Sequence, residues 1–209
     1  MLPASMRCRP GTTRILTPER DRTLTGHAIM PAMPKVLPDK ATARMRHDVI
    51  DGMASTAAFS HCGRYRYALW RRWADGPQLL FVMLNPSTAS ASANDPTIRR
   101  CIGFARDWGF AALAVGNLFA WRTPSPARLR QARGPVGGRN DAWLEHLHSQ
   151  SQLTVAAWGN HGTWRGRDVV VRALLRDPHV LGLTAAGAPR HPLYVRTMTR
   201  PQPWAGGGH

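Results

Sequence analysis

The stretch that decides the fold is LLFVMLNPSTASASANDPTIRRCIGFARDWG, residues 79–109. Its first six residues are continuously apolar, which is typical of a central strand buried on both faces. Asn94-Asp95-Pro96 then supplies a helix cap followed by proline at the first helical position, and apolar residues recur at helical spacing from Ile98 to Trp108. Gly109 is expected to end that helix. The stretch therefore predicts a buried strand followed by an amphipathic helix.

The alternation of strand and helix continues on both sides of this stretch. An alternating edge strand is expected at 64–70, buried strands at 113–115, 153–158 and 180–183, and helices at about 140–149 and 165–176. Because parallel strands need crossovers that usually contain a helix, this order predicts an α/β fold. We expect a three-layer α/β/α domain with a mostly parallel sheet of about four strands.

The two ends of the chain differ in composition from its centre. The first 52 residues contain six prolines and no aromatic residue. We therefore expect residues 1–52 to be a disordered basic extension, either a flexible arm or the result of a misassigned start codon. Residues 53–204 are expected to form the domain, and the glycine-rich 205–209 a flexible tail.

The chain is strongly basic, with a net charge of +16, and residues 53–209 hold 19 basic against 7 acidic side chains. Such an excess attracts polyanions, either nucleic acid or phosphorylated metabolites. An arginine-rich composition also follows from a GC-rich coding sequence, and Lys35 and Lys40 are the only lysines. The charge suggests a class of partner and leaves that second explanation open.

Several functional classes lack their sequence signals. No apolar run is long enough for a membrane span or a secretory signal, so a cytoplasmic protein without a membrane partner is expected. Cys8, Cys62 and Cys101 have no CxxC spacing, and His161, His179 and His191 lack the spacing of a zinc motif. The phosphate-loop and dinucleotide-binding patterns are also missing. We expect neither a metal nor a cofactor.

In a parallel sheet the ligand site lies beyond the carboxyl ends of the strands, so the segments that follow each strand are the candidates. The first is Asn85-Pro86-Ser87, where the asparagine side chain can hold a water molecule or a substrate carbonyl. The alternative is that these residues form an ordinary turn whose side chains bond the local backbone.

The second segment begins at Asn117, whose amide can pair with the edge of a nucleobase. Phe119 and Arg122 follow it and can stack on a base or reach a phosphate, although single aromatic residues more often pack in the core. The third segment contains His161, a loop histidine that can contact a substrate. The fourth contains His191, either an exposed turn residue or a donor to an oxygen that becomes negative during a reaction.

Five ordered motifs together resemble the DUF1643 family over about Tyr65 to Tyr194. These motifs are VMLNPST, NDPTIRRC, GNLFAWR, AAWGNHG and GAPRHPLY. The resemblance implies membership of one family and brings no activity with it.

A more remote resemblance is to the uracil-DNA glycosylase superfamily, whose G-x-[DN]-P turn is similar to Leu84-Asn85-Pro86 without the glycine. The resemblance implies that Asn85 positions the attacking water and that His191, in a His-Pro pair, stabilises the departing base. It also implies that Asn117 recognises the base. Asp95 lies outside the matching turn and is explained as a helix cap. The remaining implied contacts are Pro86, Ser87, Phe119 and Arg122 for the substrate, and Arg99, Arg100 and Arg190 for nucleic acid.

Three functions remain open at this point. The first is a nucleic-acid enzyme of the glycosylase type, which hydrolyses the N-glycosidic bond of an extruded or modified base, with DNA favoured over RNA. The second is a binding module for nucleic acid without catalysis. The third is an enzyme that acts on a nucleobase-containing small molecule such as a free nucleoside or nucleotide. The sequence does not assign an oligomeric state.

Overall fold

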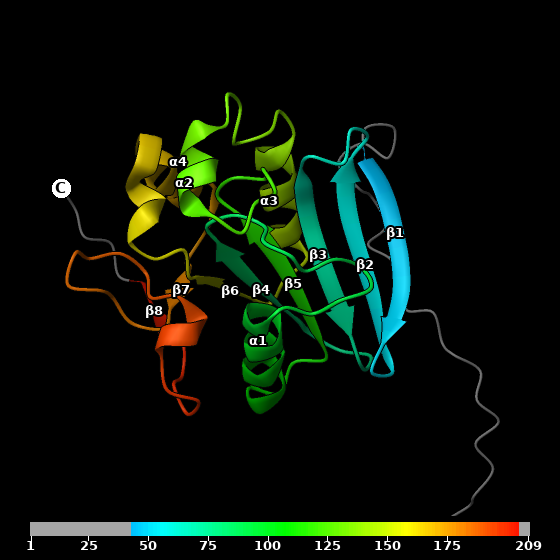
Figure 1. Cartoon of the computed structure of the whole chain (residues 1–209). Coiled ribbons are helices and arrows are strands. Elements are labelled where there is room, and N and C mark those ends of the chain that lie inside the picture. Colours follow the sequence, from blue (N-terminus) through cyan, green and yellow to red (C-terminus); the bar gives the residue numbers. More distant parts are fainter. Residues whose placement is uncertain (1–42, 205–209) are drawn as a thin grey trace, which may run out of the picture.

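The computed structural model describes residues 43–204, which form one eight-stranded mixed sheet with helices packed on it (Figure 1). The strands are β1 (Ala43–Ile50), β2 (Met53–Ser60), β3 (Arg66–Arg72), β4 (Gln78–Met83), β5 (Ala112–Asn117), β6 (Leu153–Ala156), β7 (His179–Val180) and β8 (Gln202–Pro203). The α-helices are α1 (Pro96–Asp107), α2 (Pro126–Gln131), α3 (Asn140–Ser149) and α4 (Arg167–Leu174). The order across the sheet is β1-β2-β3-β5-β4-β6-β7-β8.

The sheet has a parallel and an antiparallel part. Strands β5, β4, β6 and β7 pair in parallel, whereas β1, β2, β3 and β5 pair antiparallel and β8 is antiparallel to β7. The α/β class is thus confirmed, but the expected sheet of about four mostly parallel strands is wrong. The prediction relied on long apolar runs, and the antiparallel strands β1 and β2 are too polar or too small in their side chains to provide them.

The first hairpin corrects the expected start of the domain. Residues 43–50, placed by the sequence in a disordered extension, form β1 and pair with β2 through the two-residue turn Asp51-Gly52. Both turn residues have positive φ, 50° and 74°, as the tight turn favoured by Asp-Gly requires. The Asp51-Gly52 dipeptide was the sequence signal that could have predicted this hairpin. The other residues of the expected extension and the tail 205–209 lie outside the described part of the chain.

Strand β3 was expected at an edge, and the structure places it between β2 and β5. Two arginines on it, Arg66 and Arg71, are almost completely buried, at 2% and 0% exposure. Their guanidinium groups donate to the loop between β4 and α1, which crosses over this part of the sheet. Arg66 and Arg71 therefore indicate contact between this strand and a covering loop, and not contact with solvent.

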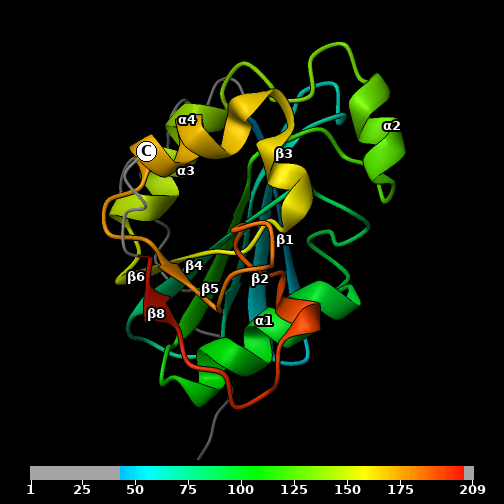
Figure 2. The same cartoon turned by 90° about the vertical axis from the view of Figure 1, so that its left-hand side faces the viewer.

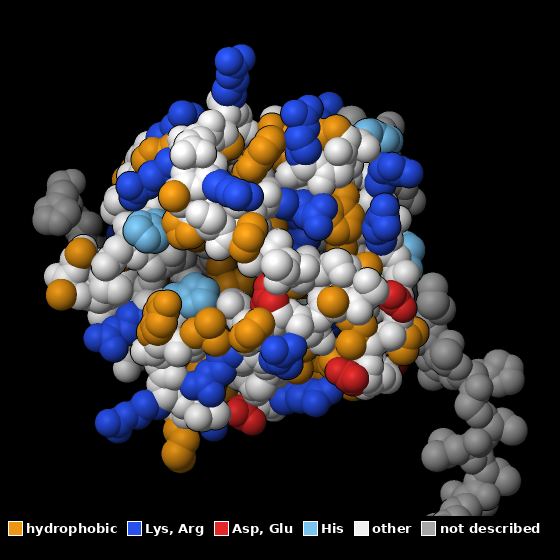
Figure 3. Space-filling model, in the orientation of Figure 1, with side chains coloured by type: hydrophobic (Ala, Val, Ile, Leu, Met, Phe, Trp, Pro, Cys, Tyr) orange, Lys and Arg blue, Asp and Glu red, His pale blue; other side chains and the backbone are white. Residues whose placement is uncertain are grey.

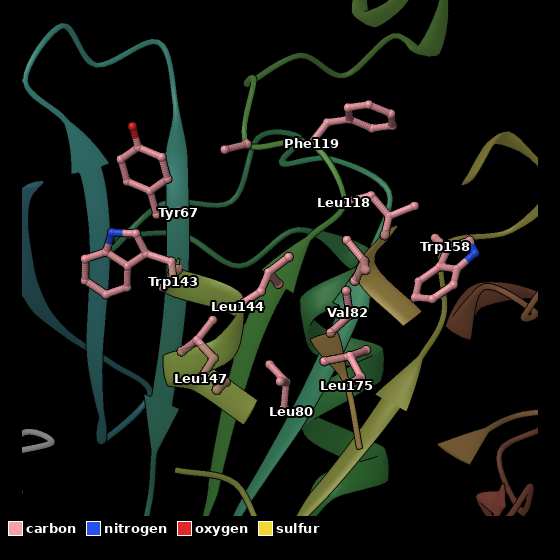
Figure 4. Close-up of a cluster of buried hydrophobic side chains, with 14 of the residues drawn as sticks. Tyr67, Leu80, Val82, Leu118, Phe119, Trp143, Leu144, Leu147, Trp158 and Leu175 are labelled. Atoms are coloured by element: carbon pink, nitrogen blue, oxygen red, sulfur yellow. The ribbon is translucent and has the colours of Figure 1, made fainter. Parts of the chain in front are cut away.

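The core lies on both faces of the sheet, as the apolar run at 79–84 predicts. On one face, α3 and α4 pack on Leu80 and Val82 of β4. Figure 4 shows Leu144 and Leu147 of α3 near Leu80, and Trp143 beside Tyr67 of β3. On the other face, α1 packs on the alternate β4 residues, which belong to a second buried cluster. The turned view in Figure 2 places α1 and the α3–α4 pair on opposite sides.

Helix α1 follows its sequence signals closely. The Asp95 side chain accepts a hydrogen bond of 2.8 Å from the backbone N–H of Ile98, and Gly109, with a φ of 82°, follows the last turn. Helix α3 matches its predicted bounds, whereas α4 starts at Arg167 because Arg165 and Gly166 have positive φ. Among the described residues no helix has the length and apolar character needed to cross a membrane.

Gly103, inside α1, offers a test of this packing. A Cβ atom there would meet nothing within 4 Å, so Gly103→Ala is expected to raise the free energy of unfolding by about 0.5–1 kcal/mol. Urea unfolding measures the change. Gly109→Ala is the control, because its Cβ is equally free of contacts but its φ of 82° strains any other residue. A loss of stability in Gly103→Ala would contradict the described packing of α1.

Candidate functional site

A cavity of about 690 Å3 opens at the carboxyl ends of β4 and β6. The chain leaves β4 for β5 on one side of it and later returns to β6 on the other, so the cavity lies where the strand order reverses. Such switch points are the usual ligand sites of α/β sheets. Figure 3 shows the hollow, floored by hydrophobic side chains and flanked by a histidine and an acidic side chain.

The structure brings some of the predicted site residues together at this cavity. Asn85, Ser87, Arg190 and His191 line it, and so does His161. Three segments that are distant in the sequence supply them: the loop after β4, the short helical segment after β6, and the segment after β7. Their meeting agrees with the expectation that the segments after the strands share one edge of the sheet.

The Asn85 side chain is partly committed to the fold. Its Nδ2 donates to the carbonyl oxygens of Thr123 and Pro86, at 2.7 and 3.1 Å, and so ties the end of β4 to the loop after β5. Its Oδ1 accepts no hydrogen bond from another described residue. Asn85 can therefore present an acceptor to the cavity, while Pro86 itself is buried and does not line it.

Asn117 and Phe119 do not line the cavity. Asn117 is paired with Met83, two residues before Asn85, so it lies deeper in the sheet, and its buried Nδ2 has no hydrogen-bond partner. Phe119 is fully buried with its ring centroid 5.0 Å from that of Trp164 (Figure 4). The structure thus assigns both side chains to the core beneath the site.

Three of the predicted arginines also lie outside the cavity. Arg99 and Arg100 of α1 donate to the carbonyl oxygens of Asn94 and Val195, each at 2.6 Å, and the Arg100 guanidinium lies 4.8 Å from the Phe104 ring centroid. Arg122 is exposed and lines a neighbouring groove. Of the predicted nucleic-acid contacts, only Arg190 reaches the cavity, with its Nε bonded to the carbonyl oxygen of Leu183 at 2.9 Å.

His191 is half-buried at the cavity wall. Burial lowers the pKa of His191 below its ordinary value, and the negative charge of Asp95 partly opposes that shift. Its Nδ1 accepts a hydrogen bond from the backbone N–H of Leu193 at 3.4 Å. The neutral ring therefore holds its proton on Nε2, and this nitrogen is a donor.

Asp95 is the site residue that the sequence analysis missed. It lines the cavity, and it is the one acidic side chain among the described residues that do so. One carboxylate oxygen caps α1, and the other has no hydrogen-bond partner in the described structure. The capping pattern correctly predicted the role of Asp95 in the helix, but it gave no indication that the carboxylate also lines the cavity. The available signal was its position, because the cap of a helix that follows a central strand lies at the carboxyl edge of the sheet.

Arg66 is a second residue that the sequence did not suggest. It lines the cavity although it is only 2% exposed, and its Nε is buried without a hydrogen-bond partner. Burial lowers the pKa of Arg66 to about 10, and Asp95 acts in the opposite direction. The guanidinium remains charged at neutral pH. It supplies a positive charge and an unused donor beside the cavity, which suits an oxygen-rich or anionic group of a ligand.

Apolar side chains form part of the wall, beside further polar residues such as Thr97, Asn160 and Thr184. Met83, Ile98 and Trp158 line the cavity, and the Trp158 ring centroid lies 5.5 Å from that of Trp204. A concave site that combines apolar and aromatic side chains with polar groups is typical of a small-molecule site. Within residues 43–204 there is no group of three or more His, Cys, Asp or Glu side chains that could hold a metal ion.

The comparisons with known proteins identify a family without adding an activity. No curated protein and no solved structure matches the chain. Residues 66–193 match a family model described as "Protein of unknown function (DUF1643)", which agrees with the motifs at 65–194. The match covers more than half of the sequence and all of the residues that line the cavity except Tyr194, and the chain therefore belongs to the DUF1643 family.

Proposed function

We propose that the cavity receives a nucleobase and that the protein hydrolyses the N-glycosidic bond that joins this base to its sugar. The observation that carries the proposal is that Asp95 and His191 line one cavity, together with Asn85, at the carboxyl ends of β4 and β6. A carboxylate and a fixed imidazole donor are the two groups that such a hydrolysis requires.

The reaction assigns one task to each group. The free oxygen of Asp95 accepts a proton from a water molecule as that water forms a bond to the sugar carbon, and the Asn85 Oδ1 orients the water. The bond between the sugar carbon and the base nitrogen breaks, and its electron pair leaves with the base. The Nε2–H of His191 donates a hydrogen bond to the base as negative charge develops on it. The base anion then takes up a proton, and Asp95 releases the one it accepted, so the products are a sugar with a hydroxyl group and a neutral free base.

The cavity itself favours a base as the bound group. Its volume of about 690 Å3 is large enough for a nucleotide, and Trp158 and Ile98 supply apolar wall for a ring. A base that enters from nucleic acid must leave its stack, at a cost of a few kcal/mol. The net charge of the chain, +16, favours contact with the phosphates that would offset this cost. We propose nucleic acid, DNA before RNA, as the substrate.

The test is an incubation of the full chain with oligonucleotides that contain uracil or other damaged bases, in single- and double-stranded form. Released base is detected by chromatography, and the abasic site by alkaline strand cleavage. The proposal expects both products, with strong loss in His191→Ala and Asn85→Ala. A broad panel without any released base overturns it. Base release from free nucleosides without cleavage of oligonucleotides overturns nucleic acid as the substrate and retains the hydrolysis.

A further inference from the structure

A second hollow, separate from the cavity, lies over the antiparallel part of the sheet. It has a volume of about 500 Å3 and lies between the β1–β2 hairpin, the loop after β4 and the loop after β5. We call it the arginine groove and define it by the residues Arg44, Arg46, Arg122, Ser60, Ser90 and Ser92, all of which line it. None of the predicted catalytic residues takes part in it.

The arginine groove has an excess of positive charge. Arg44 and Arg46 are two residues apart on β1 and therefore point to the same face, and both are exposed without a hydrogen bond among the described residues. Arg122 faces them; burial and the charge of Arg46 both lower its pKa. Within residues 43–204, Asp48 is the one acidic side chain that lines the groove, and the backbone N–H of Val49 donates to it. The lining also includes His47, which is hydrogen-bonded to Thr56.

A shallow depression connects the arginine groove to the cavity. It shares Gly63 and Arg122 with the groove and Ser87, Thr123 and Pro124 with the cavity. Trp121 and Arg64 lie in this depression, and the Arg64 guanidinium is 5.9 Å from the Trp121 ring centroid. The three hollows therefore form one continuous track from β1 to the ends of β4 and β6.

The geometry points to a single nucleic-acid strand as the occupant of this track, with phosphates on the arginine groove, a base against Trp121 and a second base in the cavity. Basic grooves interleaved with aromatic side chains are the usual design of single-strand sites. The serine hydroxyls at the groove suit phosphate oxygens. The inference rests on the proposed function only for the base in the cavity, because the groove and its charge stand apart from the reaction.

The first test is the affinity of the full chain for a single-stranded oligonucleotide at several salt concentrations. The variant Arg44→Gln/Arg46→Gln/Arg122→Gln removes three phosphate contacts, so the slope of log K against log salt should fall by about 2. The matched control is Arg133→Gln/Arg176→Gln/Arg196→Gln, three exposed arginines that line none of the three hollows, and it should leave the slope nearly unchanged. Because every variant keeps residues 1–42, the basic side chains there affect all of them equally.

The second test measures occupancy of the groove through the alkylation rate of Cys62. This exposed thiol is hydrogen-bonded to Ser60 of the groove at 3.3 Å, and that bond, with contacts to Arg64, lowers the pKa of Cys62 to about 7. Cys101 is buried, and burial raises its pKa, so it should not react. In a Cys8→Ser background, the bound oligonucleotide is expected to slow alkylation of Cys62 at least several-fold. The triple variant should lose this protection because it binds the oligonucleotide more weakly. Arg64, which lowers the pKa of Cys62, remains in place, so the alkylation rate without oligonucleotide should not change.

The outcomes separate the inference from the proposed function. Unchanged salt slope and unchanged Cys62 protection in the triple variant overturn the strand track, even if base release is observed. If the triple variant shows a lower salt slope and no Cys62 protection, and no base is released from any substrate, the strand track is supported and the proposed hydrolysis is overturned. If the triple variant is poorly folded by circular dichroism, Arg44→Gln/Arg46→Gln replaces it, because these two exposed side chains hold no other part of the structure. Its slope should fall by about 1.4.

Discussion

Asp95→Asn is expected to lower the rate of base release about 10²- to 10⁴-fold and to leave the fold intact. The carboxylate of Asp95 has two separate tasks in the structure. One oxygen accepts the 2.8 Å hydrogen bond that caps α1, and the other is available to accept a proton in the cavity. Asparagine caps a helix about as well as aspartate, so the substitution removes the charge and retains the cap. Single-turnover rates and thermal unfolding of the same preparations measure the two effects.

Asp95→Ala is the matched control for this experiment. It removes the cap as well as the charge, so it should lose the same activity and in addition about 1 kcal/mol of stability. A second readout does not depend on activity: the Asp95 charge raises the pKa of His191 against the effect of burial. The pKa of His191, followed by NMR, should therefore fall in Asp95→Asn. Full activity in Asp95→Asn would contradict the role of the carboxylate, whatever the stability of the variant.

The sequence predicted the parts of the fold that depend on local patterns. The apolar run at 79–84, the cap at Asp95 and the helical spacing that follows it are local patterns. The bounds of β4 and α1 lie within about one residue of those expected. Strand partners are not determined locally. The alternation at residues 64–70 predicted an edge strand, but β3 lies inside the sheet, and the loop between β4 and α1 buries Arg66 and Arg71.

The candidate site was predictable to the same extent. The rule that segments after parallel strands share one edge of the sheet was enough to find Asn85, His161 and His191. The rule does not predict how far each side chain extends beyond the end of its strand. Asn117 ends its strand at the level of Met83 and stays in the core, whereas Asp95, assigned only to capping, reaches the cavity. Depth along the strand depends on register, which the sequence of one strand does not contain.

Buried side chains of the sheet hold the loop that carries this site, and Arg71 makes the most hydrogen bonds to it, so Arg71→Leu is expected to destabilise the protein by about 3 kcal/mol. Arg71 is 0% exposed. Its Nε donates to the Asn94 side chain at 2.8 Å, and its Nη2 donates to the carbonyl oxygens of Ser90 and Ala93, at 2.7 and 3.3 Å. Leucine fills part of the volume but leaves these acceptors buried without a donor, and that loss dominates the change.

Arg72→Leu is the control, one residue further along the same strand. Arg72 is only half-buried, and its Nη1 donates to the carbonyl oxygens of Ala74 and Gly76 in an exposed loop, so its loss should change stability by less than about 1 kcal/mol. Urea unfolding measures both variants, and limited proteolysis between β4 and α1 reports whether the loop has loosened. Because Asp95 directly follows Asn94, Arg71→Leu should also weaken ligand binding in the cavity. Equal stability of the two variants would mean that the loop is held by its own turns and not by β3.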